Sequence, residues 1–262
     1  MKTMKNISKC LAAILLVVNL SSCVDLEPEP LSFFAPENTF MDKEGLEALL
    51  ITSRKQIKWE WFGDAFNAGY CETPLVYEYA WSDVSVMGAP EVKEIHNLET
   101  QLTPTTSMAL HLRYWDLAWN GIKYANTVIS RVPKSTIDNE TDKNELLAEG
   151  YFHRAYWYYL LVNQWGDVPL LLEEITEPKL DFYTVSRMKI LQQMKTDMEF
   201  AVKWLPKNVK PGCVNRAAGE HLLAKIYLST GDFQLAVDAT TRCINDYGLH
   251  LMKERFGVNA ED

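Results

Sequence analysis

The chain has 262 residues, of which 47% are hydrophobic and 23% are charged, and its formal net charge is −9. This length and apolar content allow a packed core in one or two domains and argue against a disordered chain. No apolar run reaches the ~18 residues that a membrane-spanning helix needs, and no basic stretch marks a nucleic-acid binder, so the composition argues against both classes.

The N-terminal residues have the order of a secretion signal. Three lysines precede an apolar run over residues 11–18, and small polar residues follow. The sequence Leu-Ser-Ser-Cys at residues 20–23 resembles a bacterial lipobox, which implies cleavage before Cys23 and acylation of that cysteine. Two acyl chains are enough for stable membrane anchoring. We therefore predict a signal peptide over residues 1–22 and a lipidated, acidic, proline-stiffened tether over residues 23–38; a plain cleaved signal is the alternative.

Most of the remaining chain has helical periodicity. A capping box starting at Thr39 precedes an apolar face that extends to Ile57, and later stripes end at proline or glycine. The apolar arc of the third stripe is wide, which indicates a helix at the centre of the core. The further helices predicted cover residues 108–132, 145–165, 186–205, 214–229 and 232–247.

The last two predicted helices carry a repeat signature. Ala224, Tyr227, Gly231, Ala236 and Cys243 have the small, aromatic, glycine, small, small spacing of a tetratricopeptide repeat. Small residues let paired helices approach closely, and the glycine supplies the C-cap of the first helix. An ordinary helical hairpin remains the alternative. The predicted fold class is all-α, with tetratricopeptide-like helical pairs.

The exception to helix is a long irregular insertion over residues 60–106. It holds eight acidic residues against one basic residue and is rich in aromatic side chains. Long loops without secondary structure are uncommon in compact domains and tend to carry function. Aromatic rings offer apolar faces on which sugars stack, so we predict Trp61, Tyr70 and Trp81 as ligand platforms, with Asp83 and Asn97 as hydrogen-bonding partners.

The sequence lacks the usual motifs of enzymes, metal sites and cofactor sites. There is no nucleophile elbow, phosphate-binding loop or zinc-protease motif, and the five histidines have no metal-ligand spacing. We predict neither metal nor cofactor and no enzymatic activity; a glycosidase-type carboxylate pair is a remote alternative. Cys71, Cys213 and Cys243 are predicted as core residues, and a disulfide between the last two is left open.

A family resemblance rests on residues 146–170. The run Leu-Leu-Ala-Glu-Gly-Tyr-Phe-His-Arg-Ala-Tyr-Trp-Tyr-Tyr-Leu over residues 146–160, followed by Gly-Asp-Val-Pro-Leu over 166–170, closely resembles the SusD/RagB family. The resemblance implies an all-α lipoprotein of the outer membrane, facing the cell exterior. It also implies a SusC-type TonB-dependent porin as partner. Glu149, Arg154 and the Gly-Asp-Val-Pro turn are interpreted as residues that maintain the fold, including an Arg–Glu pair.

The predicted function follows from this resemblance and from the aromatic insertion. We expect a surface lipoprotein that binds oligosaccharide and delivers it to the porin, with neutral glycans favoured because the mature chain carries a net charge of −12. A docking subunit without a ligand site and a peptide-binding RagB-like variant are the alternatives. Residues 39–262 would form the helical domain. Family members are longer, so the C-terminal half of the family fold is expected to be absent.

Overall fold

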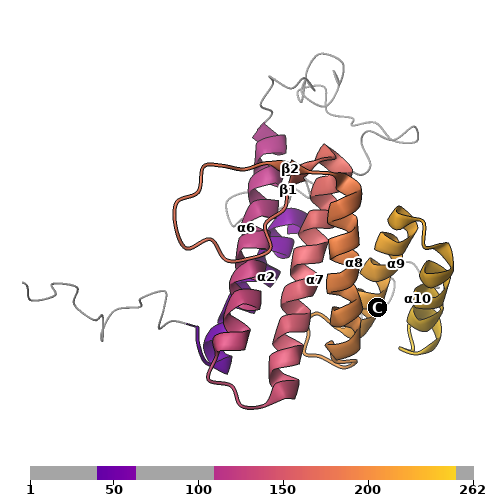
Figure 1. Cartoon of the computed structure of the whole chain (residues 1–262). Coiled ribbons are helices and arrows are strands. Elements are labelled where there is room, and N and C mark those ends of the chain that lie inside the picture. The colour runs from indigo at the N-terminus through magenta and orange to yellow at the C-terminus, as the bar shows by residue number, and fades with distance from the viewer. Residues whose placement is uncertain (1–39, 63–108, 252–262) are drawn as a thin grey trace, which may run out of the picture. The chain divides into compact units, whose positions relative to one another are not determined.

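The computed structural model describes residues 40–62 and 109–251, with side chains described over residues 40–60 and 114–251. In this part the chain is mostly helical, which confirms the predicted all-α class (Figure 1). The elements in chain order are α2 (Lys43–Phe62), α6 (Ala109–Arg131), the 3-10 turn η2 (Val132–Lys134), α7 (Glu140–Trp165), β1 (Val168–Pro169), β2 (Thr184–Val185), α8 (Arg187–Trp204), α9 (Arg216–Thr230) and α10 (Phe233–Asn245).

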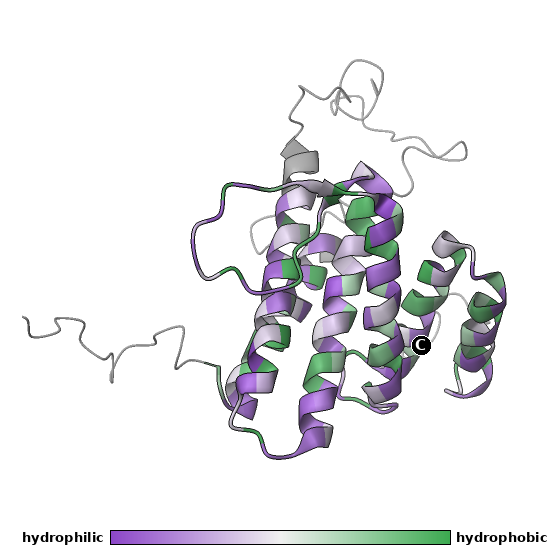
Figure 2. Ribbon diagram, viewed as in Figure 1, coloured by the Kyte–Doolittle hydropathy of each residue, from purple (hydrophilic) through white to green (hydrophobic). Residues whose placement is uncertain are grey.

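The helices pack in an order that follows the chain. α7 lies between α6 and α8, α2 packs on α6 and α7, α9 packs on α8, and α10 packs on α9 (Figure 1). The central position predicted for α7 is confirmed, because its side chains are buried against neighbours on several sides, and Trp157 and Tyr158 are fully buried. The amphipathic patterning of the outer helices can be followed in Figure 2.

Two clusters of buried side chains form the core. The larger one joins α6, α7, α8, α9 and α10. The smaller one joins the start of α2 to the end of α6 and the start of α7, around Leu46, Leu50, Val128, Val132 and Leu146. None of the helices described here is long and apolar enough to cross a membrane.

Two helix starts differ from the sequence prediction because local capping decides them. α2 begins at Lys43, where the Asp42 carboxylate accepts a hydrogen bond from the Gly45 backbone N–H at 2.8 Å, so the predicted capping box at Thr39 placed the start too early. α7 begins at Glu140 rather than residue 145. The Asn139 side chain caps it by accepting from the Thr141 N–H at 2.8 Å.

The predicted repeat pair is an antiparallel hairpin of α9 and α10. Gly231 ends α9 with φ +83°, and Ala224 and Ala236 are buried at 2% and 3% exposure, as a closely packed tetratricopeptide-like pair requires. Asp232 precedes α10, but its side chain does not cap that helix. Its carboxylate instead accepts from the Thr230 hydroxyl at 2.6 Å and from Lys195 Nζ at 2.9 Å, which ties the turn to α8.

The cysteines of the described region are free. Cys213 and Cys243 are both half-buried thiols, so the disulfide left open by the sequence is not formed in this structure. Cys243 Sγ lies 3.3 Å from the Ala217 carbonyl oxygen and fills the space between α9 and α10. Burial raises the pKa of this thiol. The third cysteine, Cys71, lies outside the described residues.

Candidate functional site

Most of the predicted ligand residues lie outside the described part of the chain. This holds for Tyr70, Trp81, Asp83 and Asn97, and for the predicted lipidation site, which is Cys23. Trp61 falls in the last turn of α2, but its side chain is not described. The ligand-platform and lipidation assignments therefore stay predictions. Helix α2 extends to Phe62, so the predicted irregular insertion is wrong at residues 60–62, and the rest of it lies outside the described residues.

The described residues hold a second candidate region, built on the segment that joins β1 to β2. Val168 and Pro169 pair antiparallel with Val185 and Thr184, and residues 170–183 between them form a long loop. The sequence predicted a Gly-Asp-x-Pro turn here but no strand pair. The Asp167 carboxylate accepts from the Arg187 backbone N–H at 2.8 Å, so the turn also caps α8.

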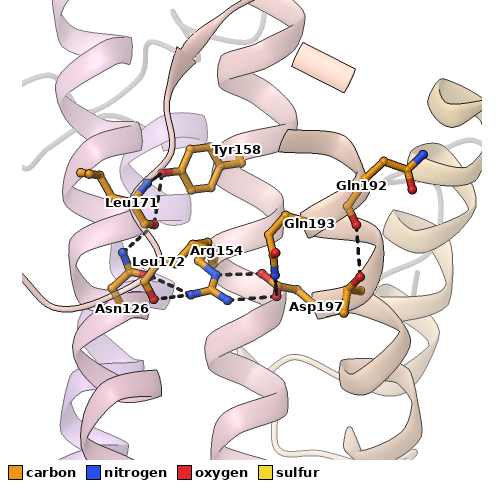
Figure 3. Close-up of polar contacts among 9 residues, drawn as sticks. Asn126, Arg154, Tyr158, Leu171, Leu172, Gln192, Gln193 and Asp197 are labelled. Carbon is orange, nitrogen blue, oxygen red and sulfur yellow. Dashed lines mark hydrogen bonds and ion pairs between the residues drawn. The ribbon is translucent and has the colours of Figure 1, made fainter. Parts of the chain in front are cut away.

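The base of this loop is attached to a buried polar network centred on Arg154 (Figure 3). The Arg154 guanidinium donates to both oxygens of the Asp197 carboxylate at 2.8 and 2.9 Å. It also donates to Asn126 Oδ1 at 3.1 Å and to the Leu172 carbonyl at 2.8 Å. One side chain of α7 thereby binds α6, α8 and the loop. The predicted role of Arg154 in maintaining the fold fits this position, but its partner is aspartate rather than glutamate.

Two further side chains bind the loop backbone next to Arg154. Asn126 Nδ2 donates to the Leu171 carbonyl at 2.9 Å. The Tyr158 hydroxyl accepts from the Leu171 N–H at 2.6 Å and donates to the Leu171 carbonyl at 3.2 Å (Figure 3). Burial raises the pKa of this tyrosine, so the hydroxyl keeps the proton that it donates. Buried backbone groups of the loop are thus paired as they must be to remain stable.

The loop is attached again a few residues further on. Arg131, at the end of α6, donates to both Glu174 oxygens at 2.9 and 2.6 Å. The Ser130 hydroxyl accepts from the Glu174 backbone N–H at 3.0 Å. This second attachment and the Arg154 network hold residues 171–174 along α6.

A pocket of about 580 Å³ lies between α6 and this loop. Its volume is within the ~300–1,000 Å³ range of small-molecule sites. Most of its wall is apolar, with aromatic rings from both sides. The lining residues are Trp115, Trp119, Ile122, Lys123, Asn126, Thr127, Pro169, Leu171, Glu173, Glu174, Ile175 and Phe182.

The polar groups of the pocket divide into bound and free ones. Asn126 and Glu174 are engaged in the loop attachments described above. Lys123 and Glu173 are exposed, and among the described residues their side chains make no ion pair or hydrogen bond. Within the described part of the chain, the pocket therefore offers one free cation and one free carboxylate beside an aromatic wall, which suits a ligand with apolar faces and hydroxyl groups.

The sequence did not point to this pocket, because its tryptophans lie within the helix predicted over residues 108–132 and only rings of the insertion were predicted as platforms. Trp115 and Trp119 are half-buried: their rings pack edge to face at 5.4 Å, and both reach the pocket. Trp157, in contrast, is fully buried. The available signal was the long loop after the Gly-Asp-x-Pro turn, which brings Phe182 to the same pocket.

Glu149, the glutamate of the family-like motif, is paired with an arginine of α2. Glu149 of α7 receives a hydrogen bond from Arg54 Nη2 of α2 at 2.8 Å, and His153 Nε2 lies 3.4 Å from the same carboxylate. Burial alone would raise the pKa of Glu149, but its contacts with His153 and Arg54 outweigh burial and lower it. The predicted role of Glu149 in maintaining the fold fits this buried position. No group of three metal-ligating side chains occurs among the described residues.

Comparison with known proteins places the chain among SusD-like proteins. SusD-like protein P2 of Formosa agariphila is 27% identical over 238 residues, which cover 89% of this chain and 45% of that protein. A SusD superfamily protein of Bacteroides vulgatus superposes with a TM-score of 0.69 at 20% identity, over 82% of this chain and 46% of the other. A laminarin-binding SusD-like protein superposes with a TM-score of 0.67 at 22% identity, over 80% of this chain and 46% of the other.

A further structure, described as a complex with xylogluco-oligosaccharide, gives a TM-score of 0.64 at 21% identity, over 79% of this chain and 41% of the other. The chain therefore spans less than half the length of these relatives. At such identities the structural likeness establishes the fold alone. The family itself is established by sequence: a SusD-like family described as starch-binding and associating with the outer membrane matches residues 70–228, more than half of the chain. The chain therefore belongs to this SusD-like family.

Proposed function

We propose that the protein binds oligosaccharide at the cell surface and delivers it to a SusC-type TonB-dependent porin. The family match over residues 70–228 is the observation that carries this proposal. It is supported by relatives of the same fold that are described with laminarin and with a xylogluco-oligosaccharide. Because the chain covers less than half of these relatives, both the ligand and the porin are proposals for this protein.

The proposed location is the outer membrane, with the body held by acyl chains on Cys23 and facing the exterior. The lipobox-like residues 20–23 support the anchor, and the outer-membrane description of the family supports the location. Metabolic labelling with palmitate tests the anchor. Wild-type protein should take up label, and the Cys23→Ala variant should not; label that persists in Cys23→Ala would exclude Cys23 as the acylated residue.

Direct binding measurements test the ligand class. Calorimetry of residues 23–262 with oligosaccharides of laminarin and of xyloglucan should give dissociation constants in the micromolar to millimolar range. Stacking yields about 1.5 kcal/mol per ring, so a few rings only reach the low end of the ~4–15 kcal/mol cost of association, and polar contacts must supply the rest. Trp61→Ala and Trp81→Ala test the predicted platforms and should each weaken binding. Unchanged affinity in both variants would remove these two residues from the site.

The same preparation distinguishes the alternatives. Co-purification with a porin without measurable glycan binding would favour a docking subunit, and binding of peptides instead of glycans would favour a RagB-like variant. We propose that the protein is not an enzyme, so incubation with polysaccharide should release no reducing ends. Their release would favour a hydrolase.

A further inference from the structure

We propose that the pocket between α6 and the 170–183 loop is an oligosaccharide-binding site for uncharged sugars. In this assignment a sugar ring packs against Phe182 and Trp115, and its hydroxyl groups bond to Lys123 and Glu173. The assignment rests on the proposed glycan-binding function and names lining residues other than the predicted platforms Trp61, Tyr70 and Trp81.

The two walls of the pocket are held in place before any ligand binds. One wall is α6, which packs along α7 in the core. The other wall is the loop, whose residues 171–174 are held by Arg154, Asn126 and Tyr158 and by the Arg131–Glu174 ion pair. A site whose walls are already ordered loses little conformational entropy on binding, so it can bind a weakly interacting ligand such as a sugar.

The lining of the pocket matches the two-sided chemistry of a sugar ring. Trp115, Trp119 and Phe182 supply aromatic surface, against which the C–H face of a pyranose can be buried. Phe182 is 45% exposed, and Lys179 Nζ lies 5.8 Å from the centroid of its ring, so part of the side chain is accessible to a ligand. The exposed Lys123 and Glu173 groups add polar partners at the pocket, because sugar hydroxyls can accept from the first and donate to the second.

The charges around the pocket favour an uncharged ligand. Glu173 and Glu174 both line it, and only Glu174 is neutralised by an arginine. A sulfate or carboxylate group on the sugar would approach the free Glu173 carboxylate, and like charges brought together out of water repel. Lys123 offers one compensating charge, which leaves the free groups of the pocket balanced for a neutral glycan.

The test uses calorimetry on residues 23–262 with a laminarin oligosaccharide and a xyloglucan oligosaccharide. Phe182→Ala should weaken binding about tenfold, as expected for the loss of one stacking surface. Lys123→Ala and Glu173→Gln should each weaken it several-fold. Leu180→Ala is the matched control, because Leu180 belongs to the same loop, is 98% exposed and does not line the pocket; its affinity should stay within twofold of wild type.

A blocking variant makes the test independent of any single contact. Ile175→Trp adds bulk at a half-exposed lining position and should abolish binding, while circular dichroism and the thermal midpoint stay as in wild type. Wild-type affinity in both Ile175→Trp and Phe182→Ala would overturn the assignment of this pocket and leave glycan binding intact. Absence of binding by the wild-type protein would instead contradict the proposed function itself.

Discussion

Arg154 is the side chain that connects the most parts of the fold through polar contacts. It is 3% exposed and joins α7 to Asp197 of α8, Asn126 of α6 and the carbonyl of Leu172. A buried guanidinium needs this many acceptors, because an unpaired charge inside a protein is costly. The same residue thus stabilises the helical frame and fixes one wall of the pocket.

Removing this arginine should be strongly destabilising. Arg154→Met leaves the Asp197 carboxylate buried without its cationic partner, which costs about 3–5 kcal/mol in unfolding free energy. Urea denaturation measures the change. Lys143→Met is the control, since it removes the exposed Lys143–Glu140 pair and should cost less than ~1 kcal/mol. Equal losses in the two variants would contradict a structural role for the Arg154–Asp197 pair.

The Glu149 carboxylate should make stability depend on pH in the acid range. Its pKa in the folded state lies below its usual value of 4.5, so the unfolded chain takes up the proton first as pH falls. The stabilisation is therefore complete above about pH 4.5 and is lost as pH drops through the folded-state pKa. Urea midpoints measured at pH 7 and at several values below 4.5 should fall more steeply in wild type than in Glu149→Gln.

The control for this effect is Glu47→Gln, at an exposed position on α2. This variant should follow the wild-type pH profile. Glu149→Gln should already be less stable at pH 7, because Arg54 loses a charged partner. If the urea midpoints of wild type and Glu149→Gln fell in parallel with pH, Glu149 would not be the cause of the loss of stability in the acid range.

At the scale of elements, the contact between α6 and α7 is tightest at Gly121 among the glycines of these two helices that the structure describes. A Cβ atom at Gly121 would overlap the fully buried indole of Trp157. We expect Gly121→Ala to destabilise the protein by about 1–3 kcal/mol, because a rigid buried ring has no free space to move into. The expected loss is opposite in sign to the gain in stability of ~1 kcal/mol that a glycine-to-alanine substitution usually gives within a helix.

Gly219→Ala in α9 is the matched comparison. The added Cβ would lie 2.8 Å from Leu205 Cδ1, at the free end of a flexible side chain that can rotate away. Its cost should therefore be smaller than that of Gly121→Ala, and the thermal midpoints of the two variants rank them. A larger loss for Gly219→Ala would contradict the assignment of Gly121 as the closest constraint between α6 and α7.

The helices could be predicted from the sequence because each has its own apolar period and its own stop signal. The starts of α2 and α7 were misplaced, since capping by Asp42 and Asn139 is settled by side-chain geometry that a pattern does not encode. The hairpin of α9 and α10 could be predicted from the sequence, because glycine and small residues occupy the positions that close packing requires.

The pocket could not be predicted in the same way. Its walls come from residues about 45 positions apart, and they meet only because Asn126 and Arg131 bind the loop at Leu171 and Glu174. Nothing in the local sequence distinguishes Trp115, which lines the pocket, from a buried tryptophan such as Trp157. The distinction depends on which neighbouring element covers the ring, and that is a property of the assembled helices.

For the molecule as a whole, the outer surface of α10 is the feature that bears on association. Its inner face places Ala236 and Ala239 against α9. A second, apolar stripe is exposed on α10, with Phe233 at 66%, Val237 at 55% and Ile244 at 67%. A group of exposed apolar side chains of this kind marks a surface that associates with another protein surface.

We therefore expect residues 23–262 to self-associate through this stripe as the protein concentration rises, with α10 of one copy against α10 of another. In sedimentation velocity over a concentration series, the sedimentation coefficient of the wild-type protein should rise with concentration. The triple variant Phe233→Gln/Val237→Gln/Ile244→Gln should abolish this rise. Unfolding free energy at low concentration should change by less than ~0.5 kcal/mol per substitution, because these side chains are exposed in the monomer.

Ile51→Gln, an exposed apolar position on α2, is the control and should leave association unchanged. A wild-type chain that stays monomeric at all concentrations would show that the stripe does not bind a second copy.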